Sequence, residues 1–204
     1  AQNILEAKIS NEGLCAVHVK WIDGHITQIE AIDPNSFSPD QILLPRLVDP
    51  HTHLDKAFTW VKSPNLKGTY EEALKTNLIS HSKRKPLDVS DQAEKCLNLA
   101  CANGIRAIRS HIDSFGAQTH ECWEVLTELK KKWESTIDLQ FVALVPPEFW
   151  ATSQGKEFAT FVADANGLLG GVVLPPFDVQ TMKNSLSQMI MLAEKVGCGI
   201  DLHI

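Results

Sequence analysis

The sequence predicts an α/β protein built around a parallel sheet, and the order of its elements is the main reason. From residue 105 onward, apolar segments of strand length alternate with amphipathic segments of helix length. Such alternation is typical of right-handed βαβ units. The chain contains no G-x-G-x-x-G motif and no P-loop motif, so nothing favours a nucleotide-binding sheet. Periodicity alone leaves two architectures open: a doubly wound sheet and part of a (β/α)₈ barrel.

The first part of the chain is predicted to be a β-hairpin, at residues 14–32. Two segments rich in β-branched and aromatic residues flank Asp23-Gly24, which suits a two-residue type I′ turn. The proline-containing stretch 33–40 is expected to link this hairpin to the next strand. The predicted domains are therefore a small β domain at 1–40 and a larger α/β domain at 41–204.

The elements of the larger domain follow from periodicity and capping residues. An apolar strand is predicted to begin at Leu43 and to end at His51 and His53. Thr69-Tyr70-Glu71-Glu72 has the pattern of a capping box and starts a helix that ends near His81. The remaining elements are a helix at 89–103, a strand at 105–112, a helix at 119–133, a strand at 139–145, a helix at 156–165, a strand at 170–174, a helix at 180–196 and a strand at 199–204.

The motif that indicates chemistry is Pro50-His51-Thr52-His53-Leu54-Asp55-Lys56. Residues two apart in a strand project from the same face, so the imidazoles of His51 and His53 can reach one ion. The alternative is a pair of polar residues at a strand end. A His-x-His-Leu-Asp motif after an apolar strand is more specific than a lone histidine, and it predicts a metal site.

His203 is the third candidate metal ligand. In the last predicted strand, Ile200, Leu202 and Ile204 alternate with Asp201 and His203. The apolar set can therefore face helices while His203 faces inward. A hydrogen-bonded core histidine is the alternative.

Two further pairs of polar residues are candidate site residues. His111 and Asp113 share a face of their strand, which suits a pocket wall and equally suits a structural hydrogen bond. Asp55 and Lys56 suit the support of a metal site and equally suit a surface ion pair. We take His111, Asp113 and Lys56 as candidate substrate-binding residues.

The motif that contains His51 and His53 resembles the first-strand signature of the amidohydrolase superfamily, closest to its cytosine deaminase and N-isopropylammelide hydrolase branch. The similarity continues in Ser110-His111-Ile112-Asp113 and in Asp201-Leu202-His203-Ile204. This resemblance implies about five of the eight strands of a (β/α)₈ TIM barrel, preceded by part of a small β-sandwich. It also implies one divalent metal ion, zinc or iron, with His51, His53 and His203 as ligands.

The same resemblance implies a metal-dependent hydrolase of non-peptide C–N bonds that deaminates a small nitrogen heterocycle. Cytosine deaminases of the family carry Phe-Pro-Gln at the end of the third strand, and here Pro147 stands in the place of the glutamine. Proline has no side-chain donor or acceptor, so cytosine specificity is not expected. The catalytic acid and base are expected beyond Ile204, and the chain alone is expected not to deaminate cytosine. The alternative is a truncated, non-catalytic paralogue that acts as a binding or structural protein.

Composition narrows the classes of partner. A formal charge of −6, from 19 basic and 25 acidic residues, argues against nucleic acid and anionic membrane surfaces. No apolar stretch approaches the roughly 20 residues of a membrane span, and no signal-peptide pattern is found. The five cysteines form no C-x-x-C pair and suggest reduced thiols in a cytoplasmic protein. The basic run 83–85 is expected to be a solvated helix end.

The expected partners are a small-molecule substrate and further polypeptide. Five parallel strands cannot close an eight-stranded barrel, so two strand edges and the apolar faces beside them are expected to be exposed. The C-terminal part of the same protein or a second copy of the chain could cover them.

Overall fold

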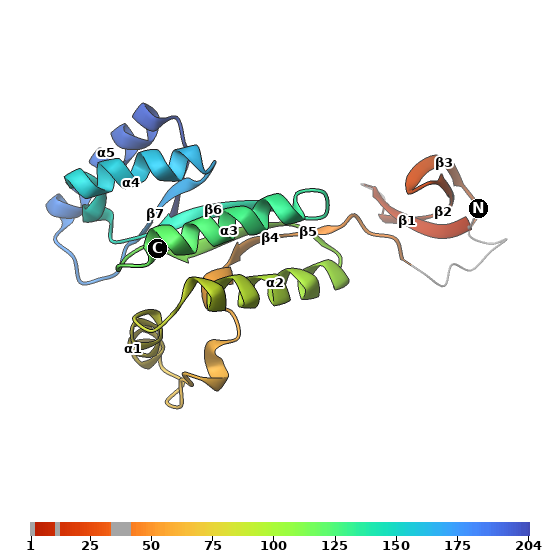
Figure 1. Ribbon diagram of the computed structural model, residues 1–204. Coiled ribbons are helices and arrows are strands. Elements are labelled where there is room, and N and C mark those ends of the chain that lie inside the picture. Colours follow the sequence, from red (N-terminus) through yellow and green to blue (C-terminus); the bar gives the residue numbers. More distant parts are fainter. Residues whose placement is uncertain (1–2, 11–12, 34–41) are drawn as a thin grey trace. The chain divides into compact units, whose positions relative to one another are not determined.

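The structure is a computed structural model that describes residues 3–10, 13–33 and 42–204. The chain divides into two units, Ala1–Arg46 and Leu47–Ile204. The first unit contains a three-stranded antiparallel sheet in the order β1-β2-β3. Its strands are β1 (Asn3–Ser10), β2 (Gly13–Ile22) and β3 (His25–Ala31), as Figure 1 labels them. The sequence predicted the β2–β3 hairpin but not β1.

The turn between β2 and β3 confirms the hairpin prediction. Asp23 and Gly24 have φ angles of 51° and 77°, and a type I′ turn requires positive φ at both central residues. The strand register accordingly pairs Ile22 with His25. Val17 and Val19 are buried on β2, two residues apart as a strand requires. The predicted linker lies almost entirely outside the described residues.

The second unit contains a five-stranded parallel sheet whose strands follow one another in chain order. A doubly wound sheet reverses its direction of growth, and this sheet does not. Right-handed crossovers that all step in one direction place their helices on one face, as in a β/α barrel. The strand order therefore decides what periodicity left open. The strands are β4 (Leu47–Thr52), β5 (Ile105–Asp113), β6 (Asp138–Leu144), β7 (Leu168–Val172) and β8 (Ile200–His203).

Five α-helices and three 3₁₀ turns connect the strands of the second unit. Figure 1 shows α2 and α3 side by side along one face of the sheet, and the two helices are in contact. The helices are α1 (Tyr70–His81), α2 (Pro86–Ala102), α3 (Thr119–Trp133), α4 (Ser153–Asp164) and α5 (Val179–Val196), and the 3₁₀ turns are η1 (Leu54–Lys56), η2 (Thr59–Val61) and η3 (Pro147–Ala151).

Side-chain caps explain where three of the helices begin. Thr69, Thr152 and Asp178 each accept a hydrogen bond from the backbone N–H three residues ahead, at the starts of α1, α4 and α5. The Thr69 bond is the first half of the predicted capping box. The Glu72 carboxylate pairs instead with Lys67 at 3.2 Å.

The hydrophobic core lies between the sheet and the helices. Strand residues two apart face it, and so do helix residues three or four apart. The Trp123 indole N–H donates to Ser114 Oγ at 2.9 Å, so this buried ring also has its polar atom satisfied. Core residues from β5, β6, α2 and α3 include Ile108, Ile112, Phe141, Ala143, Ala93, Leu97, Trp123 and Leu126.

Two expectations about apolar segments need correction. The first strand of the parallel sheet begins at Leu47 rather than Leu43, and its side chains at Leu47 and Val48 are 54% and 61% exposed. They are exposed because β4 is an edge strand of the described sheet. Helical periodicity predicts that Leu186, Met189, Ile190 and Ala193 face inward on the last helix. Met189 and Ala193 are buried on α5, but Ile190 is 51% exposed. No helix in the described part of the chain is long and apolar enough to cross a bilayer.

Candidate active site

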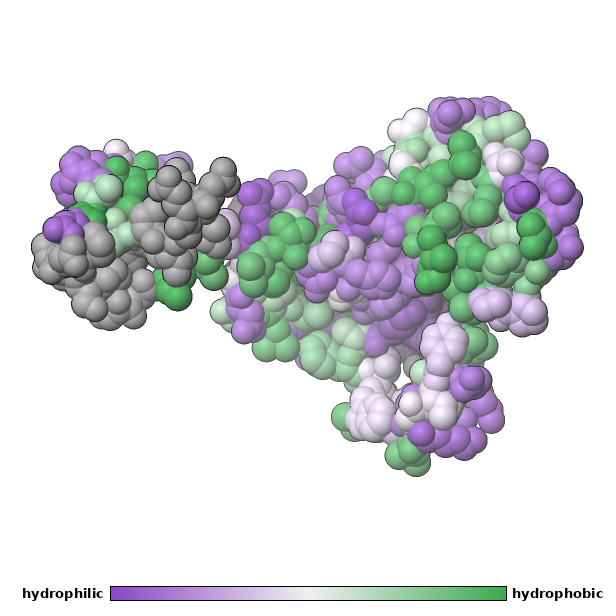
Figure 2. Space-filling view, turned by 180° about the vertical axis from the view of Figure 1, so that it is seen from behind, coloured by the Kyte–Doolittle hydropathy of each residue, from purple (hydrophilic) through white to green (hydrophobic). Residues whose placement is uncertain are grey.

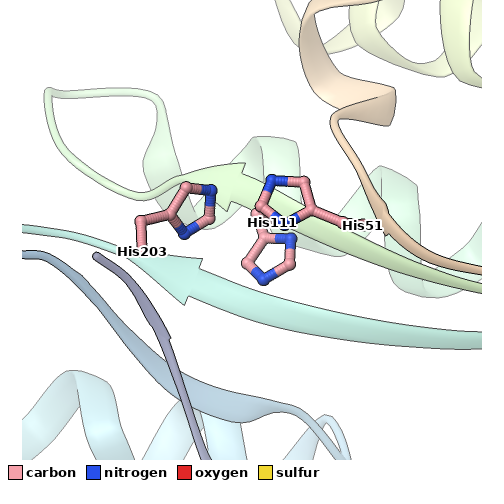
Figure 3. A group of neighbouring side chains, drawn as sticks. All are labelled: His51, His111 and His203. Carbon is pink, nitrogen blue, oxygen red and sulfur yellow. The ribbon is translucent and has the colours of Figure 1, made fainter.

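Four histidines, which we call the histidine cluster, meet at the C-terminal ends of three strands. His51 lies on β4, His53 directly follows β4, His111 lies on β5, and His203 ends β8. The ring centroids of His51, His111 and His203 are 4.3–4.5 Å apart. One nitrogen of each of these three rings lies within 4.8 Å of the others (Figure 3). The His53 centroid is 5.3–5.8 Å from the other three.

The contact between His51 and His203 shows how strongly the sheet curls. The two residues belong to β4 and β8, which are at opposite ends of the strand order. Four strand spacings of about 4.8 Å would separate them by roughly 19 Å in a flat sheet. Their rings are instead 4.4 Å apart, so the polar inner face is wrapped around the cluster.

Hydrogen bonds set the tautomers of two of the histidines. His53 Nδ1 lies 2.9 Å from the His111 carbonyl oxygen, which can only accept, so Nδ1 carries the proton and Nε2 the lone pair. His111 Nε2 lies 3.0 Å from Asp201 Oδ1 and donates in the same way, which leaves its Nδ1 with a lone pair. Each histidine therefore has one ring nitrogen held by the protein and one available as an acceptor.

Three buried ring nitrogens of the cluster have no hydrogen-bond partner in the described part of the protein. They are His111 Nδ1 and both nitrogens of His203. Buried polar atoms in native proteins are nearly always paired. Imidazole nitrogens that converge without protein partners fit the donor set of a transition-metal ion.

The protonation states of His53 and His203 also suit metal binding. Burial lowers the pKa of His53 to about 4, and the charge of Lys56 acts in the same direction. Burial likewise lowers the pKa of His203 to about 4, with the neighbouring His111 and His51 adding to the effect. Both rings are neutral at pH 7, and neutral imidazole is the form that binds metals.

Asp201 supports His111 from the inner face of β8. Arg109 Nη1 donates to its second oxygen at 2.7 Å, so the carboxylate is held between a guanidinium and an imidazole. Burial alone would raise the pKa of Asp201, but the hydrogen bonds from His111 and Arg109 hold the pKa below its usual value. The sequence patterns did not predict a role for Asp201. Its position two residues before His203, on the same strand face, is the signal that could have found it.

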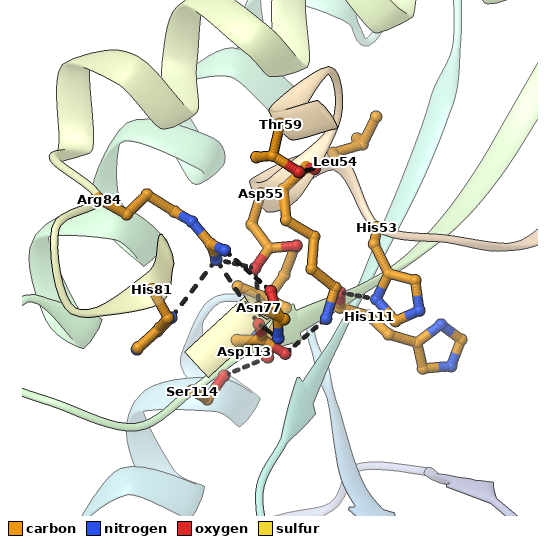
Figure 4. A network of polar contacts seen from close by, with 12 residues as sticks. His53, Leu54, Asp55, Thr59, Asn77, His81, Arg84, His111, Asp113 and Ser114 are labelled. Carbon is orange, nitrogen blue, oxygen red and sulfur yellow. Dashed lines mark hydrogen bonds and ion pairs between the residues drawn. The ribbon is translucent and has the colours of Figure 1, made fainter. Parts of the chain in front are cut away.

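A second polar group, the ionic cluster, lies beside the first and consists of Asp55, Lys56, Asn77, Arg84 and Asp113. Figure 4 labels Asp55, Asn77, Arg84 and Asp113. Arg84 donates to Asp55 at 2.9 Å and lies 3.6 Å from Asp113. Lys56 donates to one oxygen of Asp113 at 2.7 Å, and Asn77 donates to the other at 3.0 Å. The Asp113 backbone N–H donates to Asp55 at 3.1 Å. Two acidic and two basic groups therefore balance.

The ionic cluster is buried. Its burial contradicts the predicted solvated helix end at Arg84 and excludes the alternative of a surface ion pair at Asp55. Asp55 and Arg84 are only 2% and 9% exposed. Arg84 is therefore not part of a solvated helix end, although its neighbours Lys83 and Lys85 are exposed. Asp55 is equally not part of a surface ion pair. Arg84 is the arginine between two lysines, and arginine is the basic residue favoured in buried ion pairs, which is the signal that could have found it.

Burial affects the two carboxylates of the ionic cluster differently. Burial and the charge of Asp113 raise the pKa of Asp55 to about 6, against the opposing effects of Lys56 and Arg84. Burial would also raise the pKa of Asp113, but Lys56, Asn77 and Arg84 together hold that pKa below its usual value. Asp113 therefore holds its negative charge more firmly than Asp55.

Both clusters border one cavity of about 1060 Å³. His53, Lys56, Asp113 and His203 line it, and Pro147 lines it from the start of η3. His111 is fully buried beside this lining. Figure 2 shows the sheet face away from α2 and α3, with hydrophilic surface along the middle and apolar surface toward α4 and α5. Polar groups on an otherwise apolar cavity wall are typical of small-molecule sites.

Comparison with known proteins adds sequence relatives. No family model matches the chain. A pterin deaminase of Rhizobium rhizogenes is 33% identical over 96% of this chain and 46% of its own length. An N-isopropylammelide isopropyl amidohydrolase of Pseudomonas sp. strain ADP is 24% identical over 80% of this chain and 42% of its own length. The chain therefore spans about half the length of the curated relatives that it matches.

Solved structures resemble the whole chain. A 5-methylcytosine deaminase from Klebsiella pneumoniae, crystallised with phosphonocytosine, matches 99% of this chain and 51% of its own, with a TM-score of 0.79 and 21% identity. An N-isopropylammelide isopropylaminohydrolase from Burkholderia multivorans matches 100% of this chain and 53% of its own, with a TM-score of 0.64 and 20% identity. These matches confirm the predicted partial barrel.

Proposed function

The chain is homologous to deaminases and hydrolases of the amidohydrolase superfamily, and we propose that the protein is a metal-dependent hydrolase of non-peptide C–N bonds that deaminates a small nitrogen heterocycle. The observation that carries the proposal is the set of buried, unpaired ring nitrogens on His111 and His203 beside His51. A structural histidine core would pair those atoms within the protein.

The proposed ligands of one divalent cation, zinc or iron, are His51, His53 and His203. Metal-ligating histidines usually donate their other ring N–H to a carbonyl or carboxylate, and the bond from His53 to the His111 carbonyl has this form. The bond from His111 to Asp201 has the same form, and His111 lies with His51 and His203, so His111 is the alternative to His53 as a ligand. A cation held there would act as a Lewis acid that lowers the pKa of water to about 7.

The proposed substrate-binding residues are Lys56, Asp113 and His111. Lys56 uses one donor on Asp113 and borders the cavity, so its other N–H bonds can meet an acceptor on a substrate. Both oxygens of Asp113 are already engaged, so its role is to hold Lys56 in position. His111 is proposed to support the substrate site from behind the cavity wall, where its Nε2–H donates to Asp201.

The relatives named above suggest which heterocycles to test. They include a pterin deaminase and an N-isopropylammelide hydrolase. Pro147 at the cavity wall offers no hydrogen bond to a pyrimidine edge, so we expect cytosine to be a poor substrate.

Metal analysis and ammonia release test the proposal together. Protein purified without chelator is expected to carry about one zinc or iron ion per chain, by elemental mass spectrometry. When the residues expected beyond Ile204 are also supplied, we expect ammonia release from pterin, or amine release from N-isopropylammelide, at a rate well above that from cytosine. Absence of a stoichiometric metal from metal-supplemented protein would contradict the proposal. It would favour the non-catalytic paralogue that acts as a binding or structural protein.

The edges of the sheet suggest a polypeptide partner. β4 and β8 each pair with a single strand in the described sheet, and Leu47 and Val48 on β4 are exposed. We propose that further sequence of the same protein, or a second copy, pairs with these edges. Sedimentation velocity of the 204-residue chain should therefore show association, and a cooperatively melting monomer would contradict the proposal.

A cytoplasmic location is part of the same proposal. Cys96, Cys122 and Cys198 are free, partly buried thiols whose pKa values are raised by burial. Thiols of this kind suit a reducing compartment.

A further inference from the structure

Two exposed aromatic residues, Phe58 and Trp60, follow the His-x-His motif closely. They are 51% and 60% exposed. Both line the cavity that His53, Lys56 and His203 also line. Val61, next in the chain, is 89% exposed and is not part of this lining. The two aromatic residues therefore share a cavity with the polar groups of the proposed site.

The backbone at Phe58 is held in an unfavourable conformation. Its φ and ψ are 58° and 21°, in the left-handed region that a bulky residue rarely adopts. Strained residues of this kind cluster at ligand-binding sites, where the surrounding structure holds them in place. Here the Thr59 hydroxyl donates to the Lys56 carbonyl at 3.0 Å. The turn that carries both rings is thereby tied to a residue of the ionic cluster.

The other lining groups give the cavity an apolar wall and a polar floor. Phe177 and Leu174, which precede α5, are 44% and 40% exposed and line the same cavity. The floor offers N–H donors from Lys56, only one of which is used by Asp113. A flat ring that carries acceptors on one edge would match both features, because aromatic faces stack on flat rings and ammonium groups donate to acceptors.

We propose that Phe58 and Trp60 form an aromatic platform on which a planar nitrogen heterocycle stacks, with an acceptor-bearing edge directed at Lys56. The inference rests on the proposed function and adds the residues that select a flat aromatic substrate. The platform binds the ring face and takes no part in the bond that is broken.

Binding to metal-free protein tests the platform apart from catalysis. Pterin is titrated by calorimetry into chelator-treated protein, so no turnover is measured. Trp60→Leu keeps apolar area but removes the aromatic face, and we expect affinity to fall about tenfold, as for the loss of one base–aromatic stack. Trp60→Phe should recover most of the affinity, and Val61→Ala is the control that should not change it.

The outcomes of this titration are distinct from a failure of the proposed function. If Trp60→Leu binds pterin as tightly as the wild type, or if Val61→Ala weakens binding equally, the platform is wrong. Absence of pterin binding by the wild type would also overturn it. Ammonia release by the metal-loaded wild type, with the residues expected beyond Ile204 also supplied, is measured separately, and its failure would count against the hydrolase alone.

Phe58→Gly gives a second test that does not depend on Trp60. Glycine adopts positive φ without strain, so the turn can keep its backbone conformation when the Phe58 ring is removed. The affinity of the metal-free variant for pterin is expected to fall. A Phe58→Gly variant that binds pterin as tightly as the wild type would contradict the role assigned to Phe58.

Discussion

The histidine cluster and the ionic cluster border the same cavity and differ in how far the protein pairs their polar groups. In the ionic cluster every charged side chain has at least one partner of opposite charge, although Asp55 Oδ1 and Arg84 Nε are themselves buried without a hydrogen bond in the part of the chain that the structure describes. In the histidine cluster, ring nitrogens of His111 and His203 are buried with no partner among the described residues. Both clusters lie at the C-terminal ends of strands, where active sites of β/α barrels are built.

This difference distinguishes polar groups that hold the fold together from polar groups that are available to a ligand. Burying a charge is tolerable when its partners come from the protein itself, and the cluster then helps to hold the fold. Burying an unpaired nitrogen is costly unless something outside the chain binds it. We therefore expect substitutions in the ionic cluster to affect stability first, and substitutions in the histidine cluster to affect ligand binding first.

Replacing Arg84 should produce the largest effect. Arg84→Met leaves the buried Asp55 without its cationic partner, and breaking a buried pair in this way costs about 3–5 kcal/mol. Urea unfolding measures the loss. Lys83→Met, at the exposed neighbouring position, is the matched control and should stay within about 0.5 kcal/mol. If both substitutions lowered the free energy of unfolding equally, the structural role of the ionic cluster would be contradicted.

Replacing His203 should affect metal binding much more than stability. His203→Asn removes two unpaired ring nitrogens, so we expect loss of bound metal with little change in the melting temperature of chelator-treated protein. Elemental analysis and calorimetry provide the two readouts. His120→Asn, on the exposed side of α3, should retain the metal. A His203→Asn variant that keeps its metal would exclude the proposed ligand set.

Replacing Asp201 should have an intermediate effect on metal affinity, because its carboxylate contacts both Arg109 and the candidate ligand His111. Asp201→Asn weakens the bond that orients His111, and loss of such a supporting partner typically lowers metal affinity about 10–100-fold. Competition with a chromophoric chelator measures the affinity. Asp138→Asn, which breaks the exposed pair with Arg106 in the same sheet, should leave the affinity unchanged. Matching losses in both variants would mean that Asp201 acts only on the fold.

The smallest effect is expected from a carboxylate outside both clusters. Asp178 caps α5, and its hydrogen bonds with Thr181 hold its pKa below the usual value. A lowered folded-state pKa means that the stabilisation is present above the unfolded pKa near 4 and is lost as pH falls through the folded value. The melting difference between wild type and Asp178→Ala should therefore shrink at acidic pH. If the difference in melting temperature grew as the pH fell, the stabilising role of the ionised Asp178 cap would be contradicted.

Local patterns in the sequence predicted the elements well where a single face is buried. The helix predicted at 119–133 has those bounds in the structure, since Trp123, Leu126 and Leu129 form one apolar stripe. The hairpin turn followed from Asp23-Gly24 for an equally local reason. Predictions failed where burial depends on neighbours that are distant in sequence. Ile190 is as apolar as Met189, but only one side of α5 packs on the core.

The sequence by itself determined the His-x-His pair, the inward register of His203 and the alternation of strands and helices, because strand and helix periods are local properties. Only the tertiary structure decided that the sheet curls until His51 and His203 meet, that Asp201 holds His111, and that Arg84 is buried while Lys83 and Lys85 are not. The physical reason is that each of these depends on pairing between strands or helices distant in sequence. Arginine is favoured over lysine in buried ion pairs, but residues 83–85 alone do not show that Asp55 and Asp113 lie close to residue 84.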